Sequence, residues 1–65
     1  MSFNTFKARI AAIAERANET ILGFSQDEHG RYIARFSDNT RIIANATSSK
    51  VTVLFGSGHQ AMATL

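Results

Sequence analysis

The fold of this chain is decided by Tyr32-Ile-Ala-Arg-Phe-Ser-Asp-Asn-Thr-Arg-Ile-Ile-Ala44, a stretch with the pattern of a single β-hairpin. A run of alternating apolar and polar residues, a short polar turn and a second apolar run are the usual hairpin signal. If residues 37–39 form a three-residue loop, Asn39 takes the left-handed conformation that Asn tolerates well. This loop sets three pairs opposite one another: Phe36 and Thr40, Ala34 and Ile42, and Tyr32 and Ala44.

This register divides the hairpin into an apolar face and a basic face. The apolar face is suited to pack against a helix and contains Tyr32, Ala34, Phe36, Ile42 and Ala44. The opposite face contains Arg31, Ile33, Arg35, Arg41, Ile43 and Asn45. A two-residue loop would set Phe36 opposite Arg41 and mix the two faces, so burial favours the three-residue loop.

Residues 3–19 have the pattern of an amphipathic helix. Phe6, Ile10, Ile13 and Ala17 recur at steps of three and four, which places them on one stripe. Ser2 or Asn4 can supply the N-cap oxygen. The sequence therefore predicts a helix whose apolar stripe faces the hairpin.

Further strands are expected on both sides of the hairpin. Residues 20–26 are β-like but interrupted by Gly23, and residues 50–55 alternate as a strand after a polar loop. The Gly56-Ser-Gly58 segment breaks the chain, and residues 59–65 form either a closing strand or a short helix capped by Ser57. We favour the strand.

These elements predict one α+β domain over residues 1–65. Helix 3–19 packs on one face of a three- or four-stranded antiparallel β-meander formed by residues 20–65. The expected core is Phe6, Ile10, Ile13, Ala17, Tyr32, Ala34, Phe36, Ile42, Val51, Val53 and Phe55.

Composition limits the classes of protein to which the chain can belong. It has 65 residues and no Cys, so hydrophobic packing or another chain must supply the core. Apolar residues make up 45%, yet no apolar run approaches the ~20 residues of a membrane span. The N-terminus lacks the uninterrupted apolar segment of a secretory signal. We therefore expect a cytoplasmic protein without a membrane partner.

Reactive groups are few and do not converge in the sequence. His29 lies in a polar turn, and Ser57 with His59 lacks an orienting third group. The histidines and carboxylates lack metal-ligand spacing, and Gly56-Ser-Gly58 is shorter than a phosphate-binding loop. We expect no catalytic residues, no metal, no cofactor and no enzymatic activity.

The basic hairpin face is the best candidate for a contact surface. It combines charge for carboxylates or phosphates with apolar area, and the candidate partner-binding residues are Arg31, Ile33, Arg35, Arg41, Ile43 and Lys50. Direct opposition of Arg35 and Arg41 costs stability, which favours a role in binding. The alternative is an ordinary solvated face. Since one helix covers only one face of the sheet, Ile33 and Ile43 also suggest self-association, such as a homodimer, or an apolar-centred partner site.

Residues 30–45 resemble a segment of the small phage-encoded anti-CRISPR proteins that block type I surveillance complexes. The resemblance lies in Phe36-x-Asp38-Asn39-Thr40-x-Ile42-Ile43, preceded by Gly30, Tyr32 and an Ala-rich helix, and it spans about a quarter of the chain. It implies a shared fold of helix and antiparallel sheet. The relative is strongly acidic, whereas this chain has a net charge of +2, so the contact mechanism would differ and no functional residue is carried over.

Two functions follow as expectations. The first is a small protein-binding module without enzymatic activity, of the kind that a phage or mobile element uses to inhibit a host CRISPR-type complex. The second is nucleic-acid binding through the basic hairpin face. The modest net charge and the single Tyr favour the protein partner.

Overall fold

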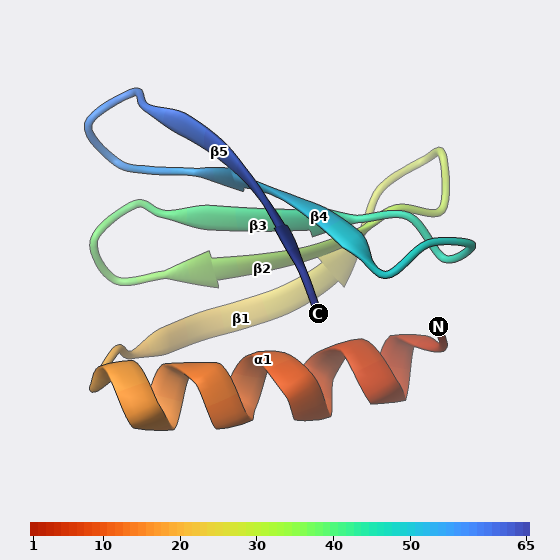
Figure 1. The fold of residues 1–65 in the computed structure, drawn as a ribbon, viewed down its shortest axis with the longest axis horizontal. Coiled ribbons are helices and arrows are strands. Elements are labelled where there is room, and N and C mark those ends of the chain that lie inside the picture. The colour runs from red at the N-terminus through yellow and green to blue at the C-terminus, as the bar shows by residue number, and fades with distance from the viewer.

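The computed structural model describes all 65 residues and has one helix and five strands. Helix α1 (Phe3–Ala17) comes first, followed by β1 (Ile21–Gln26), β2 (Tyr32–Phe36), β3 (Arg41–Ala44), β4 (Lys50–Leu54) and β5 (Gln60–Thr64). The strands form one antiparallel sheet in sequence order, and α1 lies along the β1 side (Figure 1). The α+β architecture is confirmed, with one strand more than expected. α1 lacks the length and apolar character needed to cross a membrane.

The central hairpin has the predicted register. Ala34 pairs with Ile42, and the amide of Phe36 donates to the carbonyl of Thr40 at 2.9 Å. Asn39 has a φ of 69°, the left-handed conformation expected of the third loop residue. The apolar and basic faces of the hairpin are therefore separated as the sequence predicts.

The same three-residue loop closes three of the four hairpins. Its third residue is in the left-handed region each time: Gly30 at φ 76°, Asn39 and Gly58 at φ 96°. In each loop the amide of this third residue donates a hydrogen bond to the carbonyl of the residue just before the loop, at 3.0, 3.1 and 2.9 Å, respectively. Glycine and Asn tolerate this backbone, so their positions determine where the chain reverses. Residues 60–64 consequently form a strand, as favoured, because the turn that ends at Gly58 reverses the chain against β4.

Helix α1 is bounded by a cap at each end. The Ser2 side chain accepts a hydrogen bond from the amide of Thr5 at 3.1 Å, and Asn18 ends the helix with a φ of 56°. The amide of Glu19 then donates to the carbonyl of Ala14 at 2.8 Å, which closes a Schellman-type end. The helix therefore stops two residues before the predicted boundary.

The core lies between α1 and the inner face of β1–β4. Phe6, at its centre, is fully buried and packs against Tyr32 and Phe24, with ring centroids 5.5 and 6.2 Å away. The buried apolar residues are Phe6, Ile10, Ala14, Tyr32, Ala34, Phe36, Ile42, Ala44 and Val51.

Two predicted core residues are exposed, and two others are only partly buried. Ala17 is exposed because the helical stripe that meets the sheet runs at steps of four, through Phe6, Ile10 and Ala14. Phe55 is 46% exposed because it lies beyond the end of β4, and α1 packs mainly on β1 and β2. Because α1 packs mainly on β1 and β2, Ile13 and Val53 are also only partly buried.

Candidate functional site

The face of the sheet opposite α1 is uncovered, and we call it the open face. Strand pairing arranges its residues in rows that cross the sheet. The middle row is mostly apolar and consists of Ser25, Ile33, Ile43, Thr52 and Met62. The row on the side of the central hairpin loop consists of Gly23, Arg35, Arg41, Leu54 and Gln60.

Arg35 and Arg41 are directly opposed in this second row, as predicted. The neighbouring pair, Phe36 and Thr40, is joined by a backbone hydrogen bond. Ladder alternation therefore makes the arginine pair non-hydrogen-bonded, which brings its Cα atoms to about 4.5 Å and its side chains close together. Both arginines are exposed, and neither belongs to an ion pair of the structure. Two like charges stand side by side with no carboxylate to offset them.

A bulge in β1 lies beside one of these guanidinium groups. The pairing of β1 with β2 shifts between Ile21 and Gly23, which leaves Leu22 as the extra residue with 63% of its surface exposed. Gly23 lies under the Arg35 side chain, where a methyl group would stand 3.7 Å from Nη2. That separation is an ordinary van der Waals contact, so the guanidinium lies directly against the strand at Gly23.

The bulge and the arginine pair enclose a shallow cleft of about 370 Å³. Its lining residues are Leu22, Arg35, Phe36, Asn39 and Arg41. Two guanidinium groups and an amide provide several hydrogen-bond donors, and no acidic side chain lines the cleft. Planar guanidinium groups bind carboxylates and phosphates through paired hydrogen bonds. The cleft therefore has the chemistry of an anion site with an apolar edge at Leu22.

The structure divides the six predicted contact residues into two groups. Ile33, Arg35, Arg41 and Ile43 are contiguous on the two rows described above. Arg31 and Lys50 lie beyond the middle row, on the side away from the arginine pair, where Lys50 pairs with Thr64. The open face thus has a basic residue or pair on each side of an apolar middle row.

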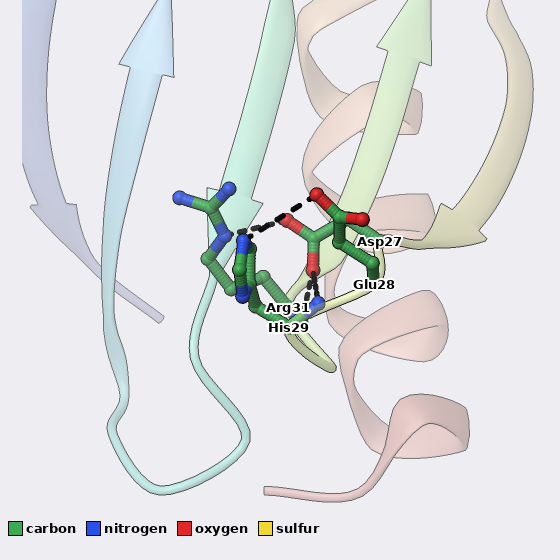
Figure 2. A network of polar contacts seen from close by, with 4 residues as sticks. All are labelled: Asp27, Glu28, His29 and Arg31. Carbon is green, nitrogen blue, oxygen red and sulfur yellow. Dashed lines mark hydrogen bonds and ion pairs between the residues drawn. The ribbon is translucent and has the colours of Figure 1, made fainter.

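Arg31 is engaged with a carboxylate within its own turn (Figure 2). Its Nε donates to Oδ2 of Asp27, while Oδ1 of Asp27 accepts from the backbone amides of His29 and Arg31, both at 2.9 Å. Partial desolvation acts to raise the pKa of Asp27, but these hydrogen bonds and the charge of Arg31 outweigh it and lower that pKa. The Arg31 charge is therefore offset locally, which leaves Arg35 and Arg41 as the unpaired basic charges of the hairpin.

The other polar residues singled out in the sequence belong to turns. His29 Nε2 lies 3.6 Å from Oε1 of Glu28, and both side chains are largely exposed (Figure 2). His59 closes the β4–β5 turn with its carbonyl, which accepts from Phe55 at 2.8 Å. No group of three or more His, Cys, Asp or Glu side chains is arranged to hold a metal ion.

Gly56 has a packing role in the Gly56-Ser-Gly58 segment. A methyl group at Gly56 would lie 2.2 Å from the carbonyl oxygen of Asp38, so only glycine lets this turn contact the central hairpin loop. Strand β5 follows the segment, whereas a phosphate-binding loop leads into a helix. The segment is a tight turn that breaks the chain between two strands, as expected from the sequence.

A second apolar surface lies on the helix side of the sheet. It is a groove of about 290 Å³ between the C-terminal half of α1 and strands β3 and β4. The apolar residues that line it are Ile13, Ala14, Ala17, Phe36, Ile42, Val53 and Phe55. Sequence reasoning missed this groove because it placed Ala17 and Phe55 inside the core.

Sequence reasoning also missed three open-face residues: Leu22, Asn39 and Met62. A glycine inside a strand pattern is a bulge signal, so Gly23 could have indicated that Leu22 projects outward. Alternation in residues 60–64 could have placed Met62 on the open face, away from Ala61 and Ala63. Asn39 was assigned only to the loop.

No family model, no curated protein and no solved structure matches this chain.

Proposed function

We propose that the protein is a small non-enzymatic binding module that docks a protein partner on the open face of its sheet. The observation that carries this proposal is the Arg35–Arg41 pair, which has no carboxylate partner and adjoins an apolar row. An opposed pair of like charges destabilises the free protein slightly. Binding to an acidic surface removes that penalty.

The layout of the open face supports a protein partner in particular. Ile33 and Ile43 form an apolar centre, Met62 ends the same row at the β5 edge, and basic residues lie on both sides of the row. An apolar centre with a polar rim is the usual anatomy of a protein–protein interface, where arginine is enriched. The partner should present apolar side chains to the middle row and an Asp or Glu carboxylate to the arginine cleft.

Nucleic-acid binding is the second candidate, because the same arginine pair suits phosphate. Single-stranded nucleic acids also need aromatic side chains on which bases stack. The aromatic side chains of this chain are directed elsewhere: Phe6, Phe24, Phe36 and Tyr32 pack on the helix side, and Phe3 lies on α1 against Tyr32. Phe55 borders the groove. The open face therefore offers charge without a stacking platform, which favours the protein partner.

The narrower form of the proposal is an inhibitor of a host CRISPR-type complex, encoded by a phage or mobile element. It rests on the resemblance of residues 30–45 to small anti-CRISPR proteins. A module that lacks converging reactive groups would act by covering a surface that the complex needs for its own contacts.

Affinity capture from lysate of the native host tests the class of partner. The protein carries a tag, the lysate is divided and one half is treated with nuclease, and captured proteins are identified by mass spectrometry. The proposal predicts a stoichiometric protein partner that survives nuclease and moderate salt, because an apolar interface is less salt-sensitive than phosphate contacts. If only nucleic acid is recovered, and its binding weakens by orders of magnitude at moderate salt, the result would favour nucleic-acid binding.

A further inference from the structure

Strand β5 (Gln60–Thr64) forms an unprotected edge of the sheet. All five of its residues are exposed, and it contains no charged residue and no Pro. Its pairing with β4 is regular from Lys50–Thr64 to Leu54–Gln60, without a bulge. The opposite edge differs, because β1 is bulged at Leu22 and contacts α1. Edge strands without charge, Pro, bulge or cover readily pair with another strand.

The backbone groups that β5 offers can be identified from its ladder. Hydrogen bonds join Phe55 to His59 at one end and Leu65 to Ser49 at the other, at 2.8 Å each. Alternation along an antiparallel strand then directs the amides and carbonyls of Ala61 and Ala63 toward β4. Those of Gln60, Met62 and Thr64 point outward at the free edge.

We propose that β5 binds β5 of a second copy of this chain, in antiparallel orientation about a two-fold axis. Met62 lies on the axis opposite Met62 of the second copy, and Gln60 lies opposite Thr64 of that copy. Each outward amide then meets an outward carbonyl, and the two sheets become one continuous sheet. A two-fold interface uses the same patch on both copies, and this edge is complementary to itself.

The side chains of β5 suit this register. No charged residue meets another across the axis, because β5 has none. Met62 is 69% exposed in the single chain, and the paired methionines extend the apolar middle row from one copy into the next. On the other face, Ala61 lies opposite Ala63 of the second copy, and these small side chains cause no clash. A β-strand of a different protein fits the same free edge but lacks this symmetric match.

Sedimentation velocity combined with amide hydrogen exchange tests the proposal. Concentrated protein should sediment at twice the 7.1 kDa mass of one chain. The outward amides of Gln60, Met62 and Thr64 should exchange at least about tenfold more slowly than in dilute protein. The amide of Gln26, which ladder alternation directs outward at the opposite edge, is the internal control and should exchange rapidly at both concentrations.

Charged variants test the position of the axis. Met62→Lys alone or Met62→Glu alone places like charges opposite each other and should raise the Kd of self-association at least about tenfold. An equimolar mixture of the two variants should restore the dimer, because opposite charges then meet. Thr52→Lys, one strand inward on the same row, should leave the dimer intact. Far-UV circular dichroism checks that each variant is folded, as expected for Met62, which is 69% exposed, and for the partly exposed Thr52.

Three results would overturn the proposal. The first is that the protein stays monomeric at high concentration. If the outward amides then become protected only when another protein is added, the edge serves a different partner and the proposal is wrong. The second is a dimer whose Gln60, Met62 and Thr64 amides exchange rapidly, which would mean that the copies meet through another face. The third is a mixture of the Lys and Glu variants that remains monomeric.

Discussion

Phe36→Ala tests whether the central hairpin supports the fold, and its effect can be worked out from the structure. Phe36 is 5% exposed and projects from β2 into the core. Truncation of a buried Phe to Ala usually costs about 3–5 kcal/mol, and the cost is lower where the site can relax. Phe36 also borders the apolar groove of about 290 Å³, so the space left behind opens toward solvent. We therefore expect a loss near the lower limit, about 3 kcal/mol.

That loss is large for a domain of this size. At about 0.05–0.15 kcal/mol per residue, 65 residues give a free energy of unfolding of roughly 3–10 kcal/mol. Urea denaturation followed by far-UV circular dichroism measures the change, provided that the slope with denaturant stays the same. The variant should unfold at a much lower urea concentration, or be largely unfolded in buffer.

Phe55→Ala is the matched control, because Phe55 lines the same groove but is 46% exposed. Full burial of a Phe contributes about 1.5–3 kcal/mol, so a half-exposed one should contribute roughly 1 kcal/mol. Equal losses for the two variants, or a loss below about 1.5 kcal/mol for Phe36→Ala, would refute the inference that the hairpin register buries Phe36 as a core residue.

Two further predictions concern the turns. Gly56→Ala should lower the free energy of unfolding by about 1–3 kcal/mol, because its methyl group would meet the Asp38 carbonyl oxygen at 2.2 Å. Urea denaturation measures this loss, and an unchanged midpoint would contradict the close contact of the two turns. Despite opposing desolvation, the hydrogen bonds and charge of Arg31 lower the pKa of Asp27 from its ordinary value of 3.8. The stabilisation by Asp27 is therefore complete above about pH 5 and is lost as pH falls through the lowered pKa. Wild type should lose more stability than Asp27→Asn between about pH 5 and pH 2, and parallel pH profiles of the two proteins would contradict this prediction.

The hairpin could be predicted because local and non-local requirements agree there. Asn39 suits the left-handed loop position, and the same loop length puts Tyr32, Ala34 and Phe36 on one face. The α+β class followed from that agreement and from the amphipathic pattern of residues 3–19. The same loop at Gly30 and Gly58 closes two of the other three hairpins.

The limits of the core depended on tertiary placement, which the sequence pattern does not contain. Steps of three and four allow Ile13 and Ala17 to join the helical stripe as readily as Ala14. The choice depends on where α1 crosses the sheet, and α1 contacts β1 and β2. The sequence pattern predicted that Phe55 belongs to a strand and to the core. In the structure β4 ends at Leu54, so Phe55 lies outside the strand and the helix does not cover it.

The candidate site was only partly predictable for a similar reason. The opposition of Arg35 and Arg41 follows from the hairpin register alone. The cleft beside them is also lined by Leu22, the bulge residue, whose position arises from pairing between β1 and β2. The ion pair of Arg31 with Asp27 depends on how the intervening turn folds back, so the pattern alone left Arg31 among the free basic residues.

The most direct test of the binding proposal is the affinity of the captured partner for two variants with equal net charge. Arg35→Gln/Arg41→Gln removes the pair on the open face, and Lys7→Gln/Arg16→Gln removes two positive charges from α1. Isothermal titration near 0.15 M salt limits long-range charge effects. The proposal predicts that the first variant raises the Kd at least about 30-fold, since truncation of an interfacial Arg costs about 2 kcal/mol, while the second changes it by less than about threefold. Equal affinities for both variants and the wild type would contradict a binding role for the open face.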